Sequence, residues 1–387
     1  MSLKHLLIFY FILVCQGCNN SILKPLNVQI DSLSKGEVSF TKRMNMDEQM
    51  NLYNVKGVSI AVINNFQIEW AKGYGVKEAG LSSPITPNTL FQSGSIGKSV
   101  VAAATLHFVE LGDLNLDENV NVKLKSWQVP ANSFTRRKNV TIRELLSHSA
   151  GATLPGVIGY AQGEPIPNLI QILNGEPPAN TPPVHIDRVP GTAFSYSGGG
   201  FLIVQQLLID LFDSQKSFPS IITEVVFNPL DMKNSTFDYW PNESKYEVAT
   251  GHRSDGTPVN GKWFNYPEMG MGVFWTTPSD MAQFVSEIML AYNGNSEKIL
   301  SQATVQTMLS PQIENQGLGV NLGDDGKDRF YFYHRGAIEG YQTYVVGYPK
   351  RGQGAVIMTN SDNGYFLIKE ILKNLSLTYR WIGGIYF

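Results

Sequence analysis

Apolar residues recur with helical spacing over residues 96–111 and 198–211. In the first segment they fall at Ile96, Val100, Val101, Ala104, Phe108 and Leu111. Residues three or four apart share one face of a helix, so this spacing predicts a helix with a buried face. Gly94 precedes the first segment and Gly112 follows it, and glycine is typical of the turns that bound helices. The second segment follows Gly198-Gly199-Gly200, so we expect two buried helices, each preceded by glycine.

Alternating and β-rich segments lie near both ends of the chain. Residues 58–63 and 67–71 flank Asn64-Asn65 and predict a β-hairpin with its turn at the two asparagines. Three more strands are predicted at 329–334, 341–347 and 354–359, separated by the turn residues Gly336, Gly340, Pro349 and Gly352. Amphipathic spacing predicts further helices at about 41–54 and 365–379.

This order of elements predicts an α/β fold of the α+β type. The economical arrangement is one antiparallel sheet built from both chain ends and flanked by helices, with a mainly helical subdomain inserted. We therefore expect a domain over 41–387, with a sheet part at about 41–90 and 245–381 and a helical part at about 91–244. The loops at 152–190 and 251–275 are expected to shape a binding site, because long irregular loops in compact domains often do so.

The composition is typical of a packed globular protein and argues against a nucleic-acid partner. Of the 387 residues, 43% are hydrophobic and 16% are charged, which argues against disorder. The formal net charge of −3 leaves no basic surplus to neutralise phosphates, so no nucleic-acid partner is expected. The six histidines show no metal-ligand spacing, and we expect neither a metal nor a cofactor.

The first 18 residues are typical of an export signal. Lys4 and His5 precede an apolar run over 6–14 that is too short for a membrane-spanning helix. The run ends at Cys15-Gln16-Gly17-Cys18, which resembles a bacterial lipoprotein signal with Cys18 as the lipidated residue. We predict export to the cell envelope, a tether over 19–40 and a membrane anchor if Cys18 is lipidated. An ordinary signal peptide cleaved nearby is the alternative.

Ser95 and Lys98 are the first candidate site residues. They stand one helical turn apart at the start of the first buried helix, so the hydroxyl and the amine share a face. The same Ser-x-x-Lys spacing occurs at 21/24, 32/35 and 39/42, but only this copy opens a long apolar helix. In isolation, such a pair is more often a helix cap and a solvated charge than a catalytic pair. His148, at the end of a short capped segment, is interpreted as a helix-end residue that bonds backbone carbonyls.

Three short motifs, taken in chain order, change this picture: Ser95-Ile96-Gly97-Lys98, Tyr196-Ser197-Gly198 and His334-Arg335-Gly336. They resemble the motifs of serine β-lactamases and penicillin-binding-protein-like hydrolases, specifically the class C β-lactamase-related branch. That branch also contains D,D-carboxypeptidases, D-aminopeptidases and esterases. Further segments at 145–151, 266–280 and 354–363 are similar too, so the resemblance covers about residues 41–380.

The resemblance implies a role for each matching residue. Ser95 would be the acylated nucleophile, with Lys98 and Tyr196 moving its proton, and His334 would join their hydrogen-bond network or contact the substrate. The backbone N–H groups of Ser95 and Ala337 would form the oxyanion hole, and substrate contacts would come from Gly198, Arg335 and Gly336. Water would deacylate the enzyme without a cofactor.

Two positions depart from the family pattern. The middle motif usually ends in Asn but has Gly198, and the last usually begins Lys-Thr-Gly in true β-lactamases but has His334-Arg335-Gly336. Lys350-Arg351-Gly352 is a competing match that fits the following strands less well. We expect a serine hydrolase of ester or amide substrates, either small molecules or peptides, at the bacterial envelope. A penicillin-binding or sensing protein with little turnover is the alternative, and a lipid-anchored structural protein is a third.

Overall fold

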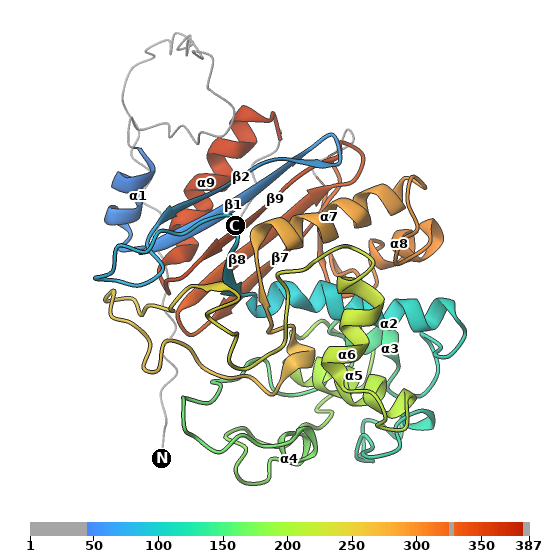
Figure 1. The fold of residues 1–387 in the computed structure, drawn as a ribbon. Helices are drawn as coiled ribbons and strands as arrows, with labels where there is room; N and C mark the ends of the chain where they lie inside the picture. Colours follow the sequence, from blue (N-terminus) through green and yellow to red (C-terminus); the bar gives the residue numbers. More distant parts are fainter. Residues whose placement is uncertain (1–44, 325–328, 382–387) are drawn as a thin grey trace, which may run out of the picture. The chain divides into compact units, whose positions relative to one another are not determined.

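The computed structural model describes residues 45–324 and 329–381. Its main element is a six-stranded sheet with the strand order β2-β1-β9-β8-β7-β6, in which every neighbouring pair is antiparallel (Figure 1). The strands are β1 Gly57–Asn64, β2 Gln67–Gly75, β6 Asn321–Gly323, β7 Tyr331–Ile338, β8 Tyr341–Tyr348 and β9 Gln353–Thr359. Strand β1 pairs with β9, so the predicted sheet built from both chain ends is confirmed.

Helices cover both faces of this sheet and fill the inserted part. The α-helices are α1 Met46–Leu52, α2 Lys98–Glu110, α3 Ile142–Leu146, α4 Leu169–Asn174, α5 Gly198–Leu211, α6 Phe218–Ile222, α7 Pro278–Tyr292, α8 Gln302–Met308 and α9 Gly364–Thr378. Short helical turns are η1 Gly94–Gly97, η2 Val120–Val122, η3 Thr223–Phe227 and η4 Met269–Met271. A small second sheet joins β3 Thr89–Gln92, β4 Glu247–Val248 and β5 Trp275–Thr276 in the order β4-β3-β5.

Successive side chains of the central strands point to opposite faces of the sheet, and each face packs into a separate hydrophobic core. On one face, Val58, Ile60 and Val62 of β1 pack with residues of α1 and α9. On the other face, Ala61 and Ile63 belong to a larger core that contains α7, α2 and α5 (Figure 1). Successive side chains of β1 point to opposite faces of the sheet, and both faces are covered. The strand is therefore apolar throughout.

Two turn predictions need correction. The β1–β2 turn lies at Asn65-Phe66 and not at Asn64-Asn65, because Asn64 still pairs with Gln67 while both turn residues adopt positive φ angles of 51° and 62°. Gly336 was expected to separate two strands, but it lies inside β7 and pairs with Thr343. Strand β7 therefore runs four residues beyond the predicted end at His334, and the whole predicted third motif lies on it.

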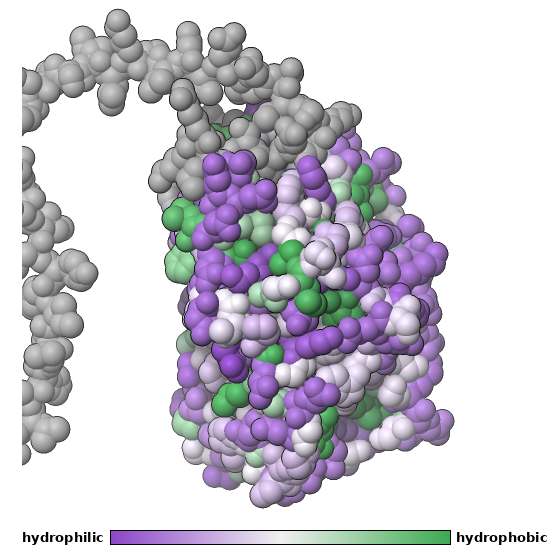
Figure 2. All heavy atoms as spheres, turned by 60° about the vertical axis from the view of Figure 1, so that its left-hand side comes forward, coloured by the Kyte–Doolittle hydropathy of each residue, from purple (hydrophilic) through white to green (hydrophobic). Residues whose placement is uncertain are grey.

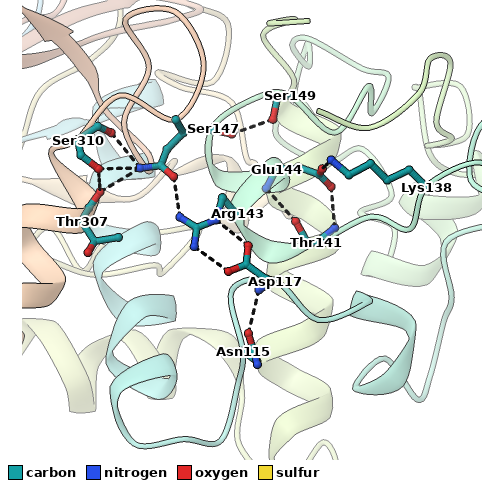
Figure 3. Close-up of polar contacts among 11 residues, drawn as sticks. Asn115, Asp117, Lys138, Thr141, Arg143, Glu144, Ser147, Ser149, Thr307 and Ser310 are labelled. Carbon is teal, nitrogen blue, oxygen red and sulfur yellow. Dashed lines mark hydrogen bonds and ion pairs between the residues drawn. The ribbon is translucent and has the colours of Figure 1, made fainter. Parts of the chain in front are cut away.

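The helical part is held by polar contacts around α3 (Figure 3). Thr141 accepts from the backbone N–H of Glu144, whose carboxylate accepts from the N–H of Thr141. This reciprocal cap satisfies N–H groups that the first turn leaves unpaired. Arg143 donates to both carboxylate oxygens of Asp117, at 2.7 and 2.8 Å, and to Gln312 at 2.7 Å. These contacts fix the helix that leads into His148.

On the face drawn in Figure 2, hydrophilic residues predominate and hydrophobic ones form small separate groups. Within the described ranges, no helix has the length and apolarity needed to cross a bilayer. The predicted export signal, the tether over 19–40, Cys18 and the three alternative Ser-x-x-Lys pairs lie outside the described residues.

Candidate active site

Ser95 lies in the turn η1, and α2 begins three residues later at Lys98. Gly94 has a φ of +55°, a conformation that L side chains rarely adopt, and it lets the chain turn sharply from β3 into η1. The Lys98 Nζ donates to the Ser95 Oγ at 3.0 Å. The one-turn spacing in the sequence therefore does bring the predicted nucleophile and its cation together.

Lys98 is fully buried, which is unusual for a lysine. Its Nζ also donates to the Met271 carbonyl at 2.8 Å and lies 5.1 Å from the centroid of the Tyr196 ring and 5.6 Å from that of Phe201. Among the described residues, no carboxylate lies within ion-pair distance of this amine. A carbonyl, a hydroxyl and two aromatic faces therefore stabilise the buried charge.

Tyr196 stands two residues before α5 and lines the same cavity as Ser95. Its ring centroid is 4.4 Å from that of His148 and 6.3 Å from that of His334. In the described part of the chain, no hydrogen bond joins its hydroxyl to Ser95 or Lys98. The structure thus places the phenol beside the pair, and its predicted role in proton transfer stays a prediction.

His148 closely follows the end of α3, as interpreted from the sequence, but the expectation that its side chain bonds backbone carbonyls is wrong. Its Nδ1 accepts from the backbone N–H of Ser197 at 3.2 Å, and its ring packs between Tyr196 and Phe201. Burial, together with the charge of Lys98, holds the pKa of His148 well below its ordinary value. The sequence signal was the buried segment 145–151, but the contact with Ser197 joins residues far apart in the chain.

His334 is buried on β7, and its ring lies near that of Tyr196. Its Nδ1 lies 2.8 Å from the carbonyl oxygen of Arg335. A carbonyl only accepts, so this nitrogen carries the proton and Nε2 is left as an acceptor. Burial and the nearby charge of Lys98 lower the pKa of His334 to about 3, so the imidazole is neutral at physiological pH.

The free edge of β7 lies directly against η1. Strand β6 pairs with β7 only at Tyr331–Tyr333. Among the described residues, the rest of β7 therefore has no strand partner on that side. The Arg335 carbonyl accepts from the His334 ring at this edge, and Ala337, two residues on, points its N–H the same way. A Cβ added to Gly94 would lie 3.1 Å from the Ala337 nitrogen, and one added to Gly336 would lie 3.1 Å from the Ser95 nitrogen. The backbone nitrogens of Ser95 and Ala337 therefore lie close together where the two glycines let η1 pack on β7, and their role as oxyanion donors stays a prediction.

A cavity of about 250 Å³ opens above these groups. Its lining comes from η1, both predicted loops, the segment before α5 and β7: Ser95, Pro155, Gly156, Val157, Tyr196, Met271, Val273, Arg335, Ala337 and Ile338. Most of these side chains are apolar. Arg335 is the cationic member, with its guanidinium 3.7 Å from the Tyr365 ring centroid and its Nη2 donating to Gln342 at 3.2 Å.

Gly198 and Gly336 are not among the residues that line this cavity. A Cβ at Gly198 would lie 2.1 Å from the Met271 Cε, so the space that an asparagine would need is filled by methionine. A Cβ at Gly336 would lie 2.1 Å from the Thr343 Oγ1 and 2.4 Å from the Ser93 carbonyl oxygen. These glycines allow close packing around the site, and direct substrate contact by either one is still untested.

The competing motif Lys350-Arg351-Gly352 lies at the turn between β8 and β9, and none of its residues lines the cavity. The described residues hold no cluster of three or more His, Cys, Asp or Glu side chains that would suit a metal ion.

A mixed fold with an antiparallel sheet, and a Ser-Lys pair at the tip of a buried helix, define the class of β-lactamases and penicillin-binding proteins. The family profile described as Beta-lactamase matches residues 43–375. The chain belongs to this family of hydrolases.

Known relatives are distant in sequence. Protein flp of Staphylococcus aureus strain MW2 is 22% identical over 84% of this chain and 63% of its own length. The unguisins hydrolase ungD' of Aspergillus campestris is 24% identical over 81% of this chain and 60% of its own. The chain thus spans about three fifths of these curated relatives.

Solved structures show the same fold. A penicillin-binding protein from Bacillus halodurans superposes with a TM-score of 0.68 at 19% identity, covering 85% of this chain and 98% of that one. The octameric penicillin-binding protein homologue from Pyrococcus abyssi gives 0.67 at 21%, covering 86% and 76%.

Proposed function

We propose that this protein is a serine hydrolase that cleaves ester or amide substrates through an acyl-enzyme on Ser95. The observation that carries the proposal is the 3.0 Å contact between the Ser95 Oγ and the fully buried Lys98 Nζ at the floor of the cavity. A buried cation within reach of a hydroxyl is one of the arrangements that activate a serine. Membership of a hydrolase family supports the same reaction.

In the proposed acylation, the Ser95 Oγ attacks the substrate carbonyl and its proton passes to the Lys98–Tyr196 pair. The carbonyl oxygen becomes an oxyanion and accepts from the N–H groups of Ser95 and Ala337. The bond to the leaving group then breaks, and the leaving group takes up the proton. Removing one such oxyanion donor typically costs about 100- to 1,000-fold in rate.

Deacylation reverses these roles with water. The same pair would take a proton from a water molecule, whose oxygen attacks the acyl carbon. The bond between that carbon and the Ser95 Oγ then breaks, and the Oγ takes up the proton. The neutral His334 keeps its Nε2 as an acceptor and adds no second positive charge beside Lys98. This keeps the pair free to accept a proton.

One observation favours a second candidate, a penicillin-binding or sensing protein that acylates with little turnover. The asparagine usual in the middle motif is replaced by Gly198, and Met271 occupies the adjacent space. A protein of this kind would show a burst of product equal to the enzyme concentration and then almost no steady-state release.

The test is a panel of short-chain p-nitrophenyl esters, nitrocefin and D-alanyl peptides, run beside Ser95→Ala and Ser99→Ala. Ser99 is buried one turn further along, in α2, and its hydroxyl donates to the Ile96 carbonyl, so it controls for loss of a helix serine. A fluorophosphonate adduct should map to Ser95 and should disappear only in Ser95→Ala. An adduct on another residue, or equal activity in both variants, would overturn the proposal.

We also propose that the protein is exported and held at the cell envelope through lipid on Cys18. The apolar run over 6–14 followed by Cys15-Gln16-Gly17-Cys18 supports this. Radiolabelled palmitate should appear in the wild type and not in Cys18→Ala. Label retained in that variant would contradict the assignment.

A further inference from the structure

Residues 267–274 form a segment, which we call the strap, that contacts both Lys98 and Ser93, the residue two positions before the nucleophile. The Met271 carbonyl accepts from Lys98, and the Gly272 carbonyl accepts from the Ser93 hydroxyl at 2.7 Å. A Cβ on Gly272 would lie 2.3 Å from the Lys98 backbone nitrogen, so the contact with the start of α2 is tight. Any movement of the strap therefore moves the acceptor of the Lys98 amine.

Gln205 of α5 holds the strap from the opposite side. Its Nε2 donates to the Pro267 carbonyl at 3.3 Å, and its Oε1 accepts from the Gly270 N–H at 2.6 Å. These two contacts flank Glu268. The Met271 N–H in turn donates to the Glu268 carbonyl at 3.0 Å, which closes η4.

Glu268 is fully buried, and neither of its carboxyl oxygens has a hydrogen-bond partner among the described residues. Two other buried glutamates differ from it. Glu287 accepts from Ser296 and from the Lys298 N–H, and Glu144 is bonded at its helix cap and paired with Lys138. A buried carboxylate without donors is costly, whereas a neutral carboxyl costs much less.

Three phenols interact electrostatically with Glu268, namely Tyr160, Tyr239 and Tyr266, and none of them supplies a positive charge. The backbone N–H of Glu268 itself favours the charged form, but less than burial disfavours it. Of the helices packed on η4, α2 carries the cation Lys98, whose amine is already bonded to Ser95 and Met271. Burial raises the pKa of Glu268 to about 7.

We propose that Glu268 is a positioning residue for Lys98, whose neutral carboxyl keeps the strap seated so that the Met271 carbonyl receives the amine. When the carboxyl ionises, the strap must shift to bring a donor or solvent to the charge, and the Met271 carbonyl moves off Lys98. Acylation of Ser95 is thereby weakened. This inference rests on the proposed serine-hydrolase function.

The test compares single-turnover acylation by a fluorophosphonate from pH 6 to pH 9 in the wild type and Glu268→Gln. Glutamine keeps the shape and cannot ionise. Normalised at pH 6, the variant-to-wild-type rate ratio should rise about fivefold between pH 7 and pH 8, as expected for one group that titrates near 7. Glu287→Gln, which changes an equally buried glutamate on α7, should give a flat ratio.

Urea unfolding at pH 5.5 and 8 tests the protonation of Glu268 without depending on enzymatic activity. The unfolding midpoint of Glu268→Gln should exceed that of the wild type more at pH 8 than at pH 5.5. If unfolding shows this trend and no variant is acylated, the proposed function fails while the protonation of Glu268 stands. A flat acylation ratio in an active enzyme would overturn the positioning role.

Discussion

The imidazole of His148 packs against the phenol ring of Tyr196, with the ring centroids 4.4 Å apart, while its Nδ1 accepts from the Ser197 N–H. One buried histidine therefore holds both the ring that lines the cavity and the backbone that follows it. This relationship makes His148 a support for the site that the sequence did not indicate.

His148→Phe keeps an aromatic ring beside Tyr196 but removes the acceptor for the Ser197 N–H. An unsatisfied buried N–H costs about 1–3 kcal/mol, so the free energy of unfolding should fall by about that amount. A small displacement of Tyr196 should also lower kcat about tenfold or more. Urea unfolding and ester kinetics check both. His185→Phe changes an exposed histidine and should alter neither; an unchanged kcat in His148→Phe would contradict the supporting role.

Arg335 should select substrates that carry a carboxylate. Its guanidinium is held by Tyr365 and Gln342, lines the cavity and has no acidic partner within ion-pair distance in the described residues. Hydrogen bonds to charged groups contribute about 1.5–3 kcal/mol, so Arg335→Gln should raise KM about 10- to 100-fold for an anionic ester. KM for a matched neutral ester should stay within about twofold. Equal effects on both esters would rule out charge recognition.

Gly198→Asn restores the residue usual in the middle motif but collides with Met271. Overpacking typically costs about 1–3 kcal/mol, and the melting temperature should fall accordingly. Gly198→Asn combined with Met271→Ala should recover part of that loss, because the smaller side chain vacates the contested space. If the double variant is as unstable as the sum of the single variants, the steric explanation is wrong.

His334 should make folding stability depend on pH in acid. Its pKa is about 3 in the fold and near 6.5 when unfolded, so below pH 6.5 the unfolded chain binds the extra proton. Stability from this group is present above pH 6.5 and is lost as the pH falls toward 3, by about 2 kcal/mol between pH 7.5 and pH 5.

His334→Gln should therefore lose about 2 kcal/mol less than the wild type over that range, measured by urea unfolding. Glu268 acts in the opposite direction, because its raised pKa makes stability fall as the pH rises from about 4.5 to about 7. The comparison must be made variant against wild type, since the two contributions oppose each other. Parallel pH curves for His334→Gln and the wild type would contradict the buried neutral imidazole.

Local spacing predicted the Ser95–Lys98 contact because both residues lie within one turn. Strand-like segments at both chain ends likewise predicted one antiparallel sheet, but which strands pair within it was not predicted. The existence of the sheet was therefore predictable from the sequence, and half of the site from a single motif.

The remaining contacts join residues far apart in the chain. The Met271 carbonyl reaches Lys98 across 173 positions, and His148 meets Ser197 across 49. Backbone carbonyls carry no sequence signal, so the first contact could not be predicted. Gly336 was misassigned to a turn because its close approach to Ser93 and Thr343 depends on packing between β7 and η1.

The pairing of β1 with β9 has a consequence for when the candidate active site is complete during synthesis. Strand β9 ends at Thr359, and the wall formed by β7 docks on η1 only within a sheet that β8 and β9 complete. A nascent chain that already exposes Ser95 and Lys98 would still lack both Ala337 and its supporting strands. If the proposed function holds, acylation of Ser95 should therefore begin only after the chain has been synthesised through Thr359 of β9.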